Sequence, residues 1–105
     1  MREATKVIGD LTKAGFTPEE ITVFLDNPYQ AYETELGRIG VLVMLQRGMK
    51  ERKLVKQIGS MNSIRLFEEG LVEKEKTDVT LTQKGIEKVL KYALERKAEN
   101  GNARN

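Results

Sequence analysis

The chain has 105 residues, of which 39% are hydrophobic and 32% are charged, and its net charge is +2. This length fits one domain with a single core, and this composition is typical of globular proteins and not of disordered or membrane proteins. Cysteine and histidine are both absent, which excludes disulfides, thiolate metal sites and imidazole catalysis. Without a phosphate-binding loop or a nucleophile elbow either, we expect a protein with no catalytic residues, no cofactor and no metal site, and not an enzyme.

The first residues and the apolar segments of the chain indicate where in the cell the protein is expected. No apolar run approaches the roughly 18 residues that a membrane span needs. The first residues, Met-Arg-Glu-Ala, lack the apolar stretch of a signal peptide. We therefore expect a cytoplasmic protein that does not contact membranes.

Local signals in the first quarter of the chain predict two helices. Apolar residues at helical spacing indicate a first helix over residues 3–14, which Gly15 ends. Thr17 and Glu20 form a capping box, which predicts a second helix that runs to about Asp26. The apolar residues expected to face the core from these helices are Ala4, Val7, Ile8, Leu11, Ile21, Phe24 and Leu25.

A third helix is expected from Asn27, which can cap it, to about residue 46. Gly37 lowers the helix propensity of this segment, so we predict either a break near it or a close contact with another helix there. Tyr29 and Tyr32 are expected in the core or in a dimer interface and not as a base-stacking platform.

The following segment predicts two short helices, over residues 50–58 and 61–69, with a tight turn at Gly59 and Ser60. The apolar residues expected to point inward from them are Leu54, Val55, Ile58, Ile64 and Phe67.

The period then changes from helical to alternating. Residues 71–74 and 79–81 are predicted as two strands around a polar hairpin loop. Thr82 is expected to cap a closing amphipathic helix, and residues 98–105 are expected to form a flexible tail.

Helix, helix, tight turn, helix, hairpin and closing helix is the order of a winged helix domain. Residues 64–74 end in Glu-Glu-Gly-Leu-Val-Glu-Lys, and residues 79–85 read Val-Thr-Leu-Thr-Gln-Lys-Gly. Both segments resemble the MarR and PadR transcription regulators, and also the small archaeal chromatin-type winged helix proteins that dimerise through a long C-terminal helix. The resemblance implies a mainly α fold with a small β-hairpin wing: a helical extension over 1–35, a winged helix domain over 36–97 and a tail over 98–105.

Charge divides the chain into two parts. Residues 1–36 carry three basic and seven acidic side chains, whereas residues 37–105 carry fifteen basic and nine acidic ones. Within residues 46–65 there are six cations and one acid. Phosphates attract such a cluster and repel an acidic surface, so we expect nucleic-acid contact in the second part.

We expect the helix at about 60–69 to lie in the major groove of double-stranded DNA and the wing, residues 71–81, to lie on the flanking backbone. Asn pairs with adenine and Arg with guanine. The residues expected to contact bases are therefore Asn62, Ser63 and Arg65. The residues expected to contact phosphates are Arg47, Lys50, Arg52, Lys53, Lys56, Ser60, Lys74 and Lys76.

The resulting hypothesis is a small dimeric transcription regulator, associated with the nucleoid, whose N-terminal and C-terminal helices form the homodimer. Alternatives remain at this stage. The basic cluster is also typical of a solvated helix face, and Asn62 and Ser63 are typical capping residues. A winged helix also serves as a protein-protein interaction adaptor without DNA binding, which predicts an exposed apolar patch. Residues 15–38 are also similar to the helix-turn-helix of sigma-like regulators, although their acidity argues against phosphate contact.

Overall fold

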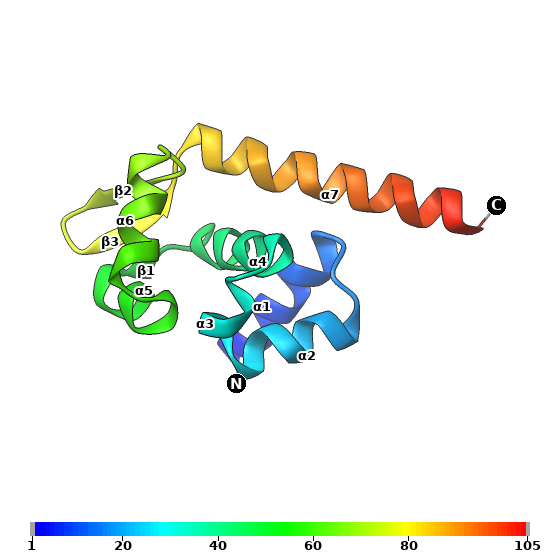
Figure 1. Cartoon of the computed structure of the whole chain (residues 1–105), viewed down its shortest axis with the longest axis horizontal. Helices are drawn as coiled ribbons and strands as arrows, with labels where there is room; N and C mark the ends of the chain where they lie inside the picture. The colour runs from blue at the N-terminus through cyan, green and yellow to red at the C-terminus, as the bar shows by residue number, and fades with distance from the viewer. Residues whose placement is uncertain (1, 105) are drawn as a thin grey trace.

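The computed structural model describes residues 2–104 of the chain, with side chains for residues 5–99. Within this range the protein is mainly helical, with one small antiparallel sheet (Figure 1). The elements are α1 (Arg2–Lys13), α2 (Pro18–Asp26), α3 (Pro28–Ala31), α4 (Glu35–Leu45), β1 (Met49–Lys50), α5 (Glu51–Ile58), α6 (Ser60–Glu68), β2 (Val72–Glu75), β3 (Asp78–Leu81) and α7 (Gln83–Arg104).

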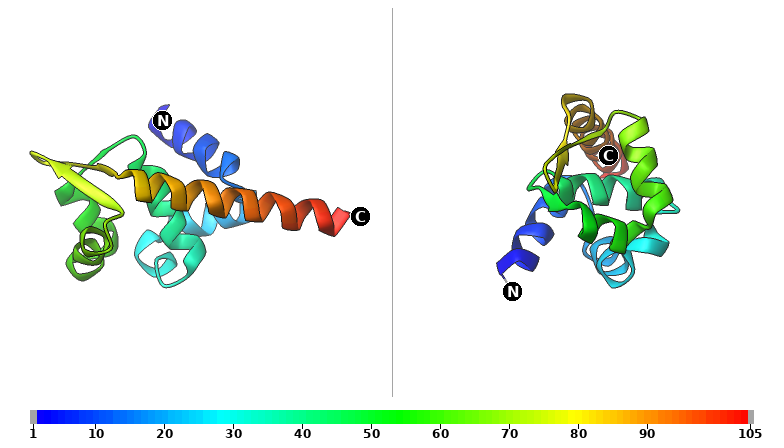
Figure 2. Two further views of the ribbon diagram at one scale, coloured as in Figure 1. Left: turned by 90° about the horizontal axis from the view of Figure 1, so that it is seen from above. Right: turned by 90° about the vertical axis from the view of Figure 1, so that its left-hand side faces the viewer.

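Helix α4 lies at the centre of the molecule. Its residues Ile39, Val41, Leu42, Val43 and Leu45 are all almost fully buried. Helices α1 to α3 pack on one side of it, whereas α5, α6 and the sheet lie at one end (Figure 1). Helix α7 runs along the molecule from that end past α4, and its last turns extend beyond the other helices (Figure 2). None of the helices in the described range combines the length and the apolar character that a membrane span requires.

The predicted starts and ends of the N-terminal helices are confirmed. The Thr17 hydroxyl accepts a hydrogen bond from the Glu20 N–H, while the Glu20 carboxylate accepts one from the Thr17 N–H at 2.8 Å. Gly15, with a φ of 96°, ends α1 as expected, because this left-handed conformation strains other residues. The Asn27 side chain accepts from the Gln30 N–H and thus caps α3.

The third predicted helix is divided into α3 and α4. The break falls at residues 32–34, a few residues before Gly37. Thr34 caps α4 by accepting from the Gly37 N–H, and the Arg38 guanidinium donates to the carbonyls of Tyr32 and Glu33, which the break leaves without helical partners. Gly37 itself makes the expected close contact, since a Cβ there would lie 1.8 Å from the Ala31 carbonyl oxygen.

The sheet has one strand more than the sequence predicts. The hairpin of β2 and β3 is confirmed, with Val72 opposite Leu81 and Glu75 opposite Asp78. The two-residue strand β1 pairs with β3, which gives the strand order β1-β3-β2. Two residues are too few for an alternating pattern, so this strand has no recognisable signal in the sequence.

The start of α7 is fixed tightly against the segment that joins α6 to β2. The Thr82 hydroxyl donates to the Gly70 carbonyl at 2.5 Å, and the Lys84 ammonium donates to the Glu69 carbonyl at 2.8 Å. At Gly85 a Cβ would lie 2.2 Å from the Leu71 carbonyl oxygen. The Leu-Thr-Gln-Lys-Gly segment therefore has a structural role, because Thr82, Lys84 and Gly85 each contact the connection between α6 and β2.

Further along, α7 is tied to the N-terminal helices by Arg96. Its guanidinium donates to the Gly15 carbonyl at 3.0 Å and to the Glu20 carboxylate at 2.6 Å. Burial favours the neutral form of Glu20, but the hydrogen bonds from Thr17 and Arg96 outweigh it and hold its pKa below the ordinary value. The helix then continues to Arg104, through most of the segment expected to be a flexible tail.

Some inward-facing predictions are wrong. Ile8 is 43% exposed, Leu25 38% and Ile64 52%. On α7, Val89 is buried, whereas Ile86, Leu90 and Leu94 are exposed and lie four residues apart on one side of the helix. Tyr32 is buried as expected, but its neighbour Tyr29 is 58% exposed. Each of these helices therefore buries a narrower stripe than its apolar content suggests.

Replacement of Gly85 by alanine should destabilise the protein by about 2–3 kcal/mol, because the new methyl group collides with a backbone carbonyl that cannot rotate away. Gly9→Ala is the matched control: nothing lies within 4 Å of its Cβ position, so this change should stabilise α1 by up to about 1 kcal/mol. Urea unfolding of both variants gives the comparison. Equal stability of the two variants would contradict the close approach at Gly85.

Glu20→Gln keeps an oxygen acceptor for Thr17 and removes the charge that meets Arg96. Because the pKa of Glu20 is lowered in the folded state, its charge stabilises the protein fully above its ordinary pKa of 4.5, and this contribution is lost as the pH falls through the folded-state pKa. The variant should thus be less stable than the wild type at neutral pH, with a difference that shrinks on acidification. Urea midpoints measured across this pH range test it, with Glu19→Gln as the exposed control; a difference independent of pH would refute it.

Candidate nucleic-acid interface

The turn between α5 and α6 consists of one residue, Gly59, which has a φ of 87°. This left-handed conformation allows α6 to begin directly after α5 ends. The absence of a side chain also lets the ring of Tyr29 lie against the turn, since a Cβ at Gly59 would be 3.1 Å from that ring. The two helices bury apolar side chains from solvent, since Leu54, Ile58 and Leu66 are each at most 2% exposed.

Two of the three residues expected to contact bases lie on the inner side of α6. Ser63 is 3% exposed, and its hydroxyl donates to the Gly59 carbonyl at 2.9 Å. Asn62 is partly buried and donates from its amide to the Ile58 carbonyl at 2.9 Å. The expectation that Ser63 faces outward is therefore wrong. The amide of Asn62 is already engaged in a hydrogen bond at the turn. Both side chains satisfy backbone carbonyls at the end of α5, which have no partner within that helix.

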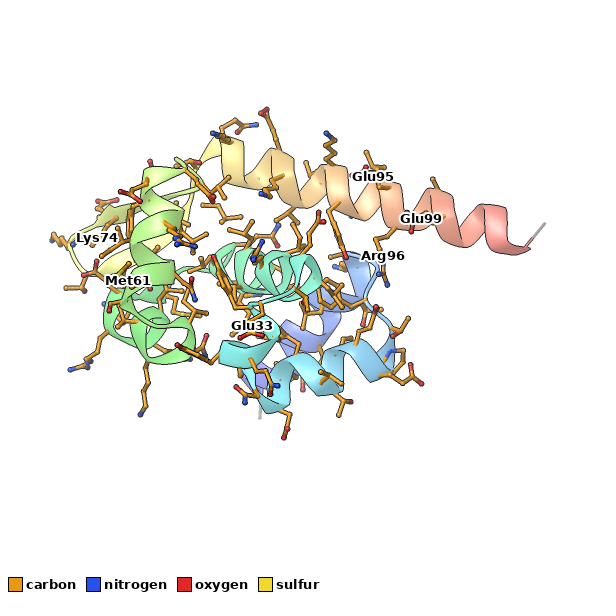
Figure 3. All side chains as sticks on the ribbon, viewed as in Figure 1. Glu33, Met61, Lys74, Glu95, Arg96 and Glu99 are labelled. Carbon is orange, nitrogen blue, oxygen red and sulfur yellow. The ribbon has the colours of Figure 1, made fainter. Side chains whose placement is uncertain are left out.

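The outward side of α6 carries Met61, Ile64, Arg65 and Glu68, which follow the spacing of one helix face. Met61 is 69% exposed, and Ile64, expected in the core, is 52% exposed. Figure 3 shows Met61 at the same end of the molecule as Lys74 of the hairpin, far from Arg96. Ile64 was missed on this face because the pair Ile64 and Phe67 has the same spacing as the pair Ser63 and Leu66. In the structure Ser63 and Leu66 are buried and Phe67 packs partly buried against the core, whereas Ile64 is exposed.

Arg65 is exposed, as expected for a residue that contacts DNA. It lines a small hollow of about 150 Å³ together with Tyr32 and Arg38. Burial raises the pKa of the Tyr32 hydroxyl, and the nearby Glu69 raises it further, against the opposite effect of Arg38 and Arg65. Ser60 is also exposed and occupies the first position of α6, where N–H groups lack helical partners.

Three cations of the predicted cluster lie together on α5. Arg52, Lys53 and Lys56 are all exposed, whereas Leu54 and Ile58 of the same helix are buried. Among the side chains of residues 5–99, no carboxylate lies within 4.0 Å of any of these three cations. They thus form an unpaired basic face, which we call the α5 basic face, next to the start of α6.

Two other cations of the cluster, Arg47 and Lys50, are paired with acids. Arg47 donates two hydrogen bonds to Asp10 of α1, at 2.6 and 3.0 Å. These hydrogen bonds outweigh the effect of burial and lower the pKa of Asp10. Arg47 is therefore engaged in holding α1 against the end of α4, although half of its side chain stays exposed.

Two lysines expected to contact phosphate connect the hairpin to the α5 region. Lys50 lies 2.9 Å from Asp78, and Lys74 lies 3.3 Å from Glu51. Lys76 is exposed at the hairpin tip with a φ of 59°, and no ion pair is recorded for it in the described range. These pairs fix the position of the hairpin and leave one free cation, Lys76, at its tip.

A hollow of about 720 Å³ lies between α1, β1 and β3. Lys53 of the α5 basic face lines it together with Lys50 and Arg47, and so does Lys6 of α1. No sequence signal connects Lys6 to this surface, because it lies more than forty residues before the other cations. The hollow extends the cationic surface from α5 towards α1.

In the described part of the chain, no three acidic side chains gather where they would hold a metal ion. The site thus offers exposed cations, an uncapped helix start and an outward face that is partly apolar, all of which serve binding. Comparison with protein-family models found no match for this sequence, and the comparisons with curated proteins and with solved structures also found none. The function is therefore inferred from the residues and their arrangement.

Proposed function

We propose that the chain is a winged helix-turn-helix protein that binds double-stranded DNA and acts as a small transcription regulator on the nucleoid, without enzymatic activity. The order of α4, α5, α6, the β2–β3 hairpin and α7 supports this proposal, because it agrees with the order expected for a winged helix domain. The one-residue turn at Gly59 supports the helix-turn-helix, and in the strand order β1-β3-β2 the hairpin supplies the central strand and one edge strand of a small sheet.

The observation that carries the proposal is the α5 basic face beside the start of α6. In a helix-turn-helix, the first helix crosses the phosphate backbone and the second enters the major groove with its N-terminal half. Within the described residues, the first helix carries three cations without an acidic partner, Arg52, Lys53 and Lys56, which suits contact with phosphates. Ser60 and Arg65 lie exposed on the second helix. Lys76 at the hairpin tip adds a third, weaker point of contact.

The proposal includes a homodimer formed through α7 and α1. Ile86, Leu90 and Leu94 form an exposed apolar stripe on α7, with 36%, 55% and 67% exposure, and Ile8 of α1 is 43% exposed. A twofold dimer would place two copies of α6 in successive major grooves, about 34 Å apart.

A second candidate function is that of a protein-interaction adaptor. The exposed Met61 and Ile64 favour it, because an apolar patch on the outward face of α6 is what such a module would present. The α5 basic face favours DNA, since a surface for an apolar partner has no need of three unpaired cations. The two functions differ in whether the chain binds duplex DNA at all.

Charge reversal on the α5 basic face tests DNA binding. The wild type should bind mixed-sequence duplex DNA with an affinity that falls as salt rises from about 50 to 300 mM, with a log-log slope between about −3 and −5 for four or five neutralised phosphates. Lys53→Glu with Lys56→Glu should abolish binding to any sequence. Lys13→Glu with Lys97→Glu makes the same change in net charge at exposed positions outside the site and should have little effect. Gel shifts at several salt concentrations give the answer, and binding that is independent of salt would refute the proposal.

The dimer is tested by sedimentation. Wild-type protein at micromolar concentration should sediment as a dimer, and Leu94→Glu should shift it to monomer because a charge on the apolar stripe opposes burial. Val23→Glu is the matched control, since Val23 of α2 has the same 67% exposure as Leu94. A monomeric wild type would reject the dimer and leave the DNA proposal in place.

A further inference from the structure

The groups that α6 offers to a DNA base differ from those that the sequence suggests. Ser63 is buried, and Asn62 donates its amide hydrogen to the Ile58 carbonyl. Hydrogen-bonding readout by these two residues would require breaking contacts that hold the helix-turn-helix together. On the N-terminal two turns of α6, this leaves Met61, Ile64 and Arg65 on the outward face, with Ser60 at the start.

Apolar side chains have one matching group in the major groove. Among the base edges exposed there, thymine carries a C5 methyl group, whereas the other bases present hydrogen-bond donors and acceptors. Met61 and Ile64 lie on one side of α6, about 4.5 Å apart along its axis. Neighbouring base pairs are about 3.4 Å apart, so two such side chains can reach methyl groups on adjacent pairs.

We infer that Met61 and Ile64 read thymine methyl groups, so that the preferred site contains adjacent T·A pairs beneath α6. This inference rests on the proposed DNA binding and adds its sequence preference. Arg65, which follows Met61 by one helical turn on the same face, reads a guanine next to them. The α5 basic face supplies affinity without sequence information, because contacts with phosphates are the same for every base.

Replacing thymine by uracil tests the inference, because deoxyuridine lacks only the C5 methyl group. A preferred duplex is first selected with the wild type from a random pool, and the same duplex is then made with deoxyuridine at each thymidine. The wild type should bind the thymine duplex more tightly, by about fourfold for each methyl group that is buried. Met61→Ala with Ile64→Ala should bind both duplexes equally and keep its salt dependence.

Val23→Ala is the control, since it truncates an apolar side chain on α2 that is about as exposed as Met61, and it should keep the preference for thymine. The double variant changes two exposed residues, and its urea midpoint verifies that it folds. Equal binding of thymine and uracil duplexes by the wild type overturns the inference while DNA binding stands. A thymine preference that persists in the double variant overturns the assignment to these two residues. If the wild type binds no duplex at any salt concentration, the proposed function fails as well, and Met61 and Ile64 belong to a protein-docking face.

Discussion

The left-handed turn at Gly59 is the constraint on which the candidate site depends. It places the start of α6 directly against the end of α5, and the hydroxyl of Ser63 and the amide of Asn62 then donate to the carbonyls of Gly59 and Ile58. These hydrogen bonds and the burial of Leu66 set the rotation of α6 about its own axis. A helix rotated in this way must turn Met61, Ile64 and Arg65 outward, because residues three and four apart share a face. Because Asn62 and Ser63 hydrogen-bond to backbone carbonyls at the turn, the outward face of the N-terminal two turns of α6 is left with apolar side chains and Arg65.

The basic cluster divides into cations that hold the fold and cations that remain free. Arg47 joins α1 to the end of α4 through Asp10, and Lys50 and Lys74 join the α5 region to the hairpin through Asp78 and Glu51. Exposed ion pairs of this kind contribute little stability each, so their main effect is on the position of the hairpin. The cations of α5 have no such partner in the described range, so they can pair with a ligand without breaking an ion pair of the fold.

Helix α7 connects the two ends of the molecule. Its first turn meets the segment between α6 and β2 through Thr82, Lys84 and Gly85, and its Arg96 meets Gly15 and Glu20. The N-terminal helices therefore support α4 and α7, and α3 also packs against α5.

Much of this architecture could be predicted from the sequence, because local interactions determine it. The capping box of Thr17 and Glu20 and the positive-φ glycines act within a few residues, so the sequence predicts where most helices begin and end. The rotation of α6 about its axis was not predictable in this way, because the pair Ile64 and Phe67 and the pair Ser63 and Leu66 have the same spacing. Tertiary packing buries Ser63 and Leu66, places Phe67 partly buried against the core and leaves Ile64 exposed. The strand β1 and the pairing of Arg47 with Asp10 likewise depend on segments about thirty or more residues apart, which only the folded chain brings together. Tertiary packing thus decided which cations are free and which side chains α6 presents.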